Sequence, residues 1–210
     1  MGDVWVNRLS LYGEVAGQPQ LDHEILGETF FRLCLKVPRL SGKHDELPVL
    51  FSSRLMDPGA VQPGLPLRIE GQLRSYKKVV DGRNRLILSA FAREIAIGQA
   101  EGETNSIVLH GTLLRDPVHR MTPLGREIAD LLVCVPRMHN KSDCLPSIAW
   151  GRNARYASTL KVGDAIAITG RMQSRDYQKK LEDGSFEDRM ALEVSVTSIE
   201  TLDKSQQAPV

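Results

Sequence analysis

The sequence predicts an all-β protein built of two tandem five-stranded barrels. Three observations lead to this prediction. Many residues recur at a constant offset of 98, apolar and polar residues alternate along several segments, and these segments occur in the same order in both halves of the 210-residue chain. Alternation with a period of two is the pattern of a strand that has one buried face.

The repeat is clearest between residues 37–54 and 135–152. Both segments contain a Val-Pro-Arg run, a Lys, an Asp, a Leu-Pro pair and an Arg in the same register. Gly13 and Gly111 match at the same offset, and no gap interrupts the match from residue 7 to residue 54. Self-similarity at a fixed period indicates duplicated structural units.

We therefore predict a first domain at residues 1–99 and a second domain at 105–202. The polar segment 98–104, with two glycines and two glutamates, is predicted to be the linker. Residues 203–210 are predicted to be a short disordered tail.

The first two strands of each domain follow from alternation. In the second domain, apolar residues fall at every second position of 107–113 and 129–135. The first domain shows the same pattern at 9–15 and 31–37. We interpret these positions as the core-facing sides of the strands.

A third strand is predicted at 145–150, matching 47–52. The segment 153–160 then has Ala and Leu at helical spacing and is followed by Gly163, a residue typical of a helix end. Its counterpart at 55–61 contains a Pro-Gly pair and is predicted to form at most one turn.

The fourth strands, near 67–73 and 166–172, each contain a central glycine. Gly71 and Gly170 suit a sharply coiled strand in which a side chain would obstruct the neighbouring backbone. Asp-Gly turns then lead into last strands near 86–97 and 190–202. Three strands, a short helix and two further strands is the order of the OB-fold, a five-stranded Greek-key barrel with the helix between strands three and four.

Composition limits the classes of function. The chain has 27 basic and 26 acidic residues, a net charge of +1, so a polyanion would have to bind a local basic patch. The three cysteines form no CxxC pair or disulfide framework, which favours a cytoplasmic protein without a metal site. We also expect no membrane span, no leader, no cofactor and no enzyme activity, because the corresponding motifs do not occur.

The second domain resembles the bacterial single-stranded DNA-binding protein family. With its internal repeat, the whole chain resembles the two-domain form of that family. The segments that carry the resemblance are Asn105 with Gly111, Asp116-Pro117, Thr-Pro-Leu-Gly at 122–125, Trp-Gly-Arg-Asn-Ala at 150–154, Leu-Lys-Val-Gly-Asp at 160–164 and Gly-Arg-Met-Gln-Ser-Arg at 170–175. The first domain resembles the family mainly through the internal repeat.

The resemblance implies base stacking on aromatic rings and phosphate contacts by cations. Trp150 and Tyr177 fall at aromatic positions of the family, whereas two further aromatic positions fall near His139 and at Cys144. Core packing is the alternative interpretation of Trp150, and an ordinary exposed hairpin position is the alternative for Tyr177. The acidic, Phe-ending tip of the family is absent from the end of this sequence.

The outer face of the second strand differs between the two copies. In the first copy it carries Phe30, Arg32 and Lys36, which suit a DNA strand, whereas in the second it carries an acidic residue and apolar ones, which suit a partner subunit. Basic residues also cluster in the hairpins of both copies, where an ordinary solvated hairpin is the alternative. The predicted DNA-binding residues are Phe30, Arg32, Lys36, Arg74, Tyr76, Lys77, Lys78, Arg83, Trp150, Arg152, Arg171, Arg175, Tyr177, Lys179 and Lys180.

The resulting expectation is a non-catalytic protein that binds single-stranded DNA and protects or organises it in replication, recombination or repair. The resemblance also implies a homodimer that presents four barrels. The alternative is an OB-fold interaction module, such as a replication-restart (primosome-like) assembly factor, with weak or no nucleic-acid binding.

Overall fold

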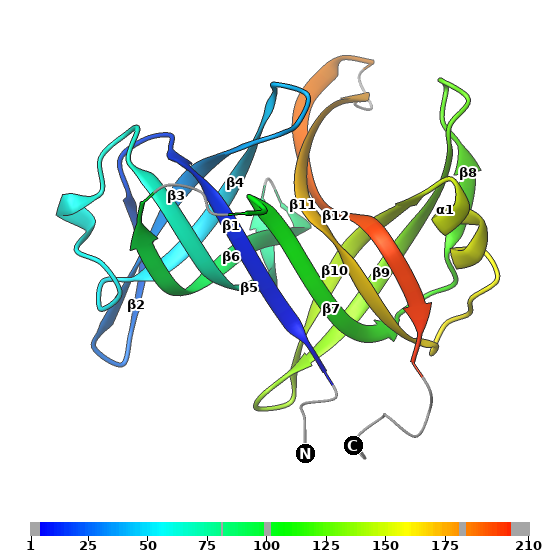
Figure 1. The fold of residues 1–210 in the computed structure, drawn as a ribbon, viewed down its shortest axis with the longest axis horizontal. Helices are drawn as coiled ribbons and strands as arrows, with labels where there is room; N and C mark the ends of the chain where they lie inside the picture. The colour runs from blue at the N-terminus through cyan, green and yellow to red at the C-terminus, as the bar shows by residue number, and fades with distance from the viewer. Residues whose placement is uncertain (1–4, 81, 99–101, 181–183, 203–210) are drawn as a thin grey trace.

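The computed structural model describes residues 5–80, 82–98, 102–180 and 184–202. Within these residues, one continuous twelve-stranded sheet curls into two barrels that stand side by side (Figure 1). No helix in this part of the chain has the length and apolar character that crossing a membrane requires. The predicted fold class, all-β with two tandem OB-fold barrels, is therefore confirmed.

The first barrel closes through contacts between non-consecutive strands. Strand β1 pairs antiparallel with both β3 and β5, and β4 pairs in parallel with β6. The elements of this barrel are β1 (Asn7–Val15), β2 (Gln20–Ile25), β3 (Glu28–Pro38), β4 (His44–Ser52), the short 3₁₀ turn η1 (Pro58–Ala60), β5 (Pro66–Val80) and β6 (Arg83–Ile97).

The second barrel repeats this arrangement, with β7 paired to β9 and β11 and with β10 parallel to β12. Its elements are β7 (Asn105–Leu113), β8 (Val118–Met121), β9 (Glu127–Arg137), β10 (Lys141–Trp150), α1 (Arg152–Ala157), β11 (Ala165–Lys180) and β12 (Phe186–Thr201). The helix lies between the third and fourth predicted strands, and its counterpart in the first barrel is the single turn η1, as expected. The helix is shorter than predicted, because it ends at Ala157 with Ser158 as its C-cap, so Gly163 does not close it.

Two short strands, β2 and β8, were not predicted. All residues of both strands are exposed, so no apolar face marks them in the sequence. Strands β5 and β11 also extend well beyond their predicted ends at 73 and 172, and β6 and β12 begin slightly before their predicted starts, so that the hairpins are longer than predicted. The predicted domain boundaries stay predictions, and residues 99–101 and 203–210 lie outside the described part of the chain.

The predicted core faces are buried, except at the start of the face on β3, where Phe31 is only partly buried and the neighbouring Phe30, predicted for the outer face, is buried instead. Leu9, Leu11 and Val15 of β1 and Ile107, Leu109 of β7 are at most 2% exposed. Their neighbours along each strand are more accessible, so the burial alternates as expected. The two barrel interiors belong to one connected cluster of buried side chains.

The glycines predicted to avoid obstruction lie where the long strands bend. The registers of β5–β6 and β11–β12 shift at Gly71 and Gly170, respectively. A Cβ atom built on Gly170 would lie 2.3 Å from the carbonyl oxygen of Ser195, and one on Gly71 would lie 2.1 Å from that of Phe91. No side chain fits at either position without a movement of the backbone.

Strands β1 and β7 join the barrels edge to edge. Leu9 lies opposite Ile107, its own equivalent at the offset of 98, and Asn7 lies opposite Leu109, the equivalent of Leu11. The join is therefore an internal two-fold pairing of the kind found in symmetric dimers. It places β6, β5, β1, β7, β11 and β12 in one continuous row.

We predict that Gly170→Ala lowers the free energy of unfolding by roughly 1–3 kcal/mol, because the methyl group must displace backbone. Thermal unfolding followed by circular dichroism measures the change. Gly17→Ala is the matched control, since no atom lies within 4 Å of a Cβ built there. Equal melting temperatures for the two variants would contradict the assignment of Gly170 to a close backbone approach.

Candidate nucleic-acid interface

Two fully buried aspartates tie the barrels together. Asp143 of β10 accepts a hydrogen bond from the backbone N–H of Ser75 (2.6 Å) and forms an ion pair with Arg74 (Nη1–Oδ2, 3.0 Å). Both partners lie on β5 of the other barrel. Arg137 approaches it from its own barrel at 3.5 Å. We call this group, with Ser75, Arg74 and Arg137, the Asp143 clamp.

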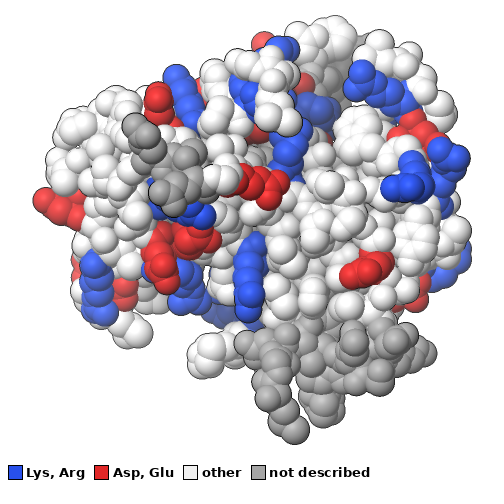
Figure 2. Space-filling view, in the orientation of Figure 1, with Lys and Arg blue, Asp and Glu red and all other residues white. Residues whose placement is uncertain are grey.

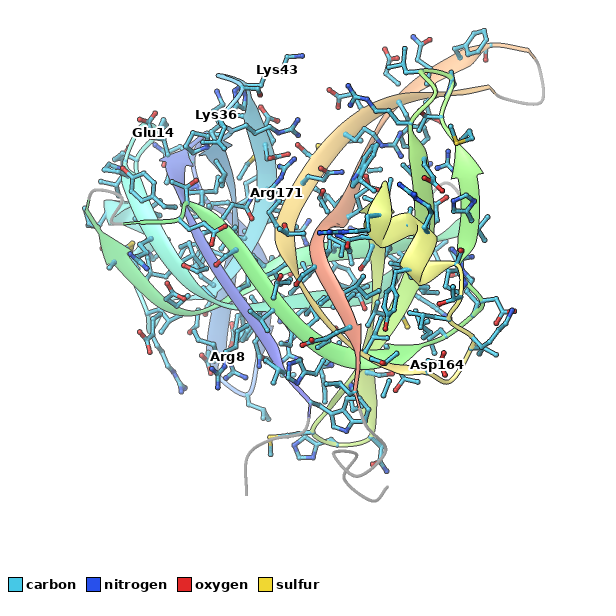
Figure 3. The ribbon with its side chains drawn as sticks, turned by 45° about the vertical axis from the view of Figure 1, so that its right-hand side comes forward. Arg8, Glu14, Lys36, Lys43, Asp164 and Arg171 are labelled. Carbon is cyan, nitrogen blue, oxygen red and sulfur yellow. The ribbon has the colours of Figure 1, made fainter. Side chains whose placement is uncertain are left out.

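The equivalent group on the other side of the join is the Asp45 clamp, formed by Asp45, Ser174, Arg171 and Arg39. Asp45 of β4 accepts a hydrogen bond from the backbone N–H of Ser174 (2.6 Å) and forms an ion pair with Arg171 (3.2 Å), and both of these residues lie on β11. Arg39 of its own barrel donates two hydrogen bonds to the same carboxylate. Figure 3 shows Arg171 between the barrels, where the clamp requires it.

The two clamps make the same contacts, but the arginine and the glutamine that make them occur in opposite order along the two strands. Counted from the equivalent bend glycines, Gln72 and Arg74 follow Gly71, whereas Arg171 and Gln173 follow Gly170. In both cases the arginine donates to the neighbouring glutamine and to the carboxylate of the other barrel. Each barrel thus supplies one interdomain arginine from a different position on its strand.

The electrostatics of the Asp45 clamp favour the carboxylate. Burial raises the pKa of Asp45, but hydrogen bonds from Arg39 and from the Ser174 N–H outweigh it. The positive charges of Arg39 and Arg171 act in the same direction. The pKa of Asp45 is therefore held below its ordinary value, so the clamp keeps its charge at neutral pH.

A cleft of about 710 Å³ lies between the long hairpins of the two barrels. Tyr76 of β5 and Tyr177 of β11 both line this cleft, with their side chains about one-third exposed. Arg32 lines it as well and donates a hydrogen bond to the Tyr76 hydroxyl (3.0 Å). The structure thus brings three predicted residues from three strands to one site.

The two walls of the cleft differ in charge. The first barrel contributes Arg32 and Arg85, whereas β12 of the second contributes Glu187, Asp188 and Glu193. Arg85 and Glu187 face each other at 4.0 Å. A negatively charged strand therefore meets cations mainly on the side of the first barrel.

The charge of one cross-strand pair is reversed between the barrels. Arg32 on β3 pairs with Asp22 on β2, while the equivalent Asp130 on β9 pairs with Arg120 on β8 (Nε–Oδ2, 2.7 Å). The cation lies beside the cleft in the first barrel and on the short strand β8 in the second. This reversal accounts for Arg32 and Asp130 at equivalent positions on the outer faces of the second strands.

An aromatic cluster on the first barrel was missed in the sequence. Phe30 is 8% exposed, because the ring of His23 stacks on it (4.9 Å between centroids) and that of Phe91 packs beside it (6.1 Å). The guanidinium groups of Arg74 and Arg93 lie over Phe91. The ring of Phe30 is therefore largely covered, and the most accessible ring of the cluster is that of His23.

The other predicted residues lie around this arrangement. Lys36, Lys77 and Lys78 are exposed, and Arg175 lies over the ring of Tyr177 at 5.6 Å. Figure 3 shows Lys36 and Lys43 toward the free end of the β3–β4 hairpin. Basic and acidic side chains intermingle on the face seen in Figure 2.

Five predicted residues lie elsewhere or lack a described side chain. Trp150 is half-buried at the end of β10, opposite Ile128, and Arg152 is exposed at the start of α1. Neither lines the cleft between the hairpins. The side chains that lie outside the described part of the structure are those of Arg83, Lys179 and Lys180.

The fold and this cleft define a tandem OB-fold protein whose barrels are joined by a shared sheet. A family model described as the single-strand binding protein family matches residues 104–202. Single-stranded DNA-binding protein 2 of Listeria innocua is 30% identical over 111 residues, covering 50% of this chain and 67% of that protein. The chain belongs to the single-strand binding protein family.

Other relatives match shorter or more distant stretches. The single-stranded DNA-binding protein of Clostridium tetani is 34% identical over 83 residues, 36% of this chain and 57% of that protein. The chain spans only about half the length of this relative and of single-stranded DNA-binding protein A of Bacillus subtilis, covering 57% and 48% of them. The crystal structure of wild-type single-stranded DNA binding protein from Thermus aquaticus shares the fold, with a TM-score of 0.72, 23% identity and coverage of 98% and 96%.

We predict that Asp45→Ala lowers the free energy of unfolding by roughly 2–3 kcal/mol, because Arg39 and Arg171 lose their common acceptor. Asp22→Ala, at an exposed ion pair, is the control and should cost less than about 1 kcal/mol. Urea unfolding measures both.

The same clamp gives a pH dependence. The lowered pKa of Asp45 means that its stabilisation is fully present above the unfolded value of about 3.9 and is lost as the pH falls through the folded value. The stability difference between wild type and Asp45→Ala should therefore shrink on acidification below about pH 4. A difference independent of pH would contradict an ionised clamp.

Proposed function

We propose that the chain binds single-stranded DNA without catalysis or a cofactor, and protects or organises it in replication, recombination or repair. The observation that carries the proposal is the cleft in which Tyr76 and Tyr177, from opposite barrels, lie with Arg32. Exposed rings offer stacking platforms to unpaired bases, and nearby cations follow the backbone. The names of the relatives support the same substrate.

The predicted contacts divide into four groups by their proposed roles. Tyr76 and Tyr177 are proposed to stack on bases, and Arg74 and Arg171 to act indirectly by holding the barrels through the clamps. The residues proposed for phosphate contacts are Arg32, Lys36, Lys77, Lys78, Arg83, Arg175, Lys179 and Lys180. Phe30, Trp150 and Arg152 remain candidates for DNA that continues beyond the cleft.

One observation favours a second candidate function. The second barrel brings Glu187, Asp188 and Glu193 to the cleft, and these carboxylates repel phosphate. A protein-interaction module with weak nucleic-acid binding, such as an assembly factor, would accommodate this acidic wall. Titration with DNA separates the two candidates.

We further propose a cytoplasmic homodimer that presents four barrels. The three free cysteines are compatible with a reducing compartment. The continuous sheet row offers a surface for a second copy, and Figure 2 shows few charged side chains over its middle, where β7 and β11 lie. Sheet faces with little charge are suited to packing against one another.

We predict that Tyr76→Ala and Tyr177→Ala each weaken binding of oligo-dT by about 1–3 kcal/mol, since a stacking platform is lost. Fluorescence titration of the full chain measures the affinity. Tyr156→Ala, at an equally exposed tyrosine on α1, is the matched control and should leave the affinity unchanged. Absence of binding by wild type at low salt would contradict the proposed function and favour the interaction module.

We predict a mass of twice 23.3 kDa in multi-angle light scattering. The reason is that two copies can pack through the sheet row and bury its weakly charged face. Substitution of Val108 in β7, which is half-buried on that row, by Glu should shift the population toward monomer. A monomer mass for the wild type at micromolar concentration would contradict the four-barrel assembly.

A further inference from the structure

Two of the three cysteines lie directly opposite each other in the second barrel. Cys134 of β9 and Cys144 of β10 are register partners, and both side chains are half-buried on the outer face of their strands. The cysteines are free thiols in this structure. The DNA-binding proposal makes no use of them.

The backbone pattern places this pair in the class of opposed residues that exchange no hydrogen bonds. Pro136 and Pro146 each lie two residues from one of the cysteines, so they belong to the same class of pairs. Proline lacks an N–H and fits there, because residues of this class donate no hydrogen bond across the β9–β10 ladder. The N–H of Cys144 donates to Ser75 Oγ (2.7 Å) rather than to β9. Opposed residues of this class have Cα atoms about 4.5 Å apart, within the range that a disulfide spans.

The equivalent positions of the first barrel carry other chemistry. Lys36 lies opposite Glu46 there, at the offset of 98 from Cys134 and Cys144. The third cysteine, Cys34, lies opposite Pro48 and has no thiol across the ladder. The pair is thus a feature of the second barrel alone among the described residues.

We propose that Cys134 and Cys144 form a redox modification site that closes reversibly to an intrachain disulfide. With oxidised glutathione as oxidant, the two thiols give up two protons and two electrons, one S–S bond forms in the protein, and two molecules of reduced glutathione leave. A disulfide fits better than a metal ion, because the described residues include no group of three His, Cys, Asp or Glu that could hold one.

The residues around the pair determine how fast the disulfide forms and which part of the structure it affects. Burial and the neighbouring Cys134 raise the pKa of the Cys144 thiol, with Lys77 acting in the opposite direction. The thiol is therefore mainly protonated at neutral pH, and exchange is slow. Since Cys144 adjoins Asp143 and bonds to Ser75, the disulfide would brace β9 and β10 beside the Asp143 clamp.

The test equilibrates the full chain in glutathione buffers of increasing oxidised fraction, followed by maleimide capping and non-reducing digestion. Trypsin cuts after Arg137 and Lys141, so the two cysteines fall in separate peptides, 127–137 and 142–152. We expect these peptides to appear as one linked species that separates on reduction, while Cys34 carries maleimide. The readout is covalent and independent of DNA binding.

Variants sharpen the result. Cys34→Ser should keep the link and Cys144→Ser should abolish it. Lys36→Cys with Glu46→Cys, placed in the Cys34→Ser chain, installs the same opposed pair in the first barrel and should close there as well. Maleimide on both native cysteines at every glutathione ratio, or a link that joins Cys34 or a second chain instead, overturns the proposal, whether or not the installed pair closes.

Discussion

Strands β1 and β7 hydrogen-bond along their edges, and every other contact between the barrels follows from that pairing. With Leu9 opposite Ile107, the two halves are related by a two-fold operation, so a feature near the join occurs twice. The long hairpins are carried across to the other barrel, where Ser75 and Ser174 meet a buried aspartate. The cleft with both tyrosines lies between the same hairpins and depends on the same geometry.

Most of the fold could be predicted from the sequence because its main signals are local and repeated. Alternation located the strands, and Gly71 and Gly170 located the bends. Strands β2 and β8 could not be found, since exposed strands lack an apolar period. The lengths of the hairpins were also underestimated, because their outer parts pack against little apolar surface.

The candidate site was less predictable, because the role of a charged residue depends on what the other barrel brings to it. Arg74 and Arg171 lie in basic hairpins, which is also the pattern of a phosphate contact, yet each binds a carboxylate 69 or 126 positions away. The recurrence of Asp45 and Asp143 at the offset of 98 was visible in the sequence. Only the pairing of β1 with β7 shows that each faces the opposite hairpin.

The covalent connection between the barrels has a consequence for how such a protein can change. In a symmetric dimer of single barrels, one mutation alters both halves at once, so a reversed ion pair would have to arise at both sites together. Here each half is encoded separately. The reversal of Asp22–Arg32 into Arg120–Asp130, and the cysteine pair that stands in for Lys36 and Glu46, are changes that only one half carries. Duplication within one gene therefore allows the two halves to specialise. Because they are covalently linked, the effective concentration of one barrel at the other does not depend on the amount of protein made.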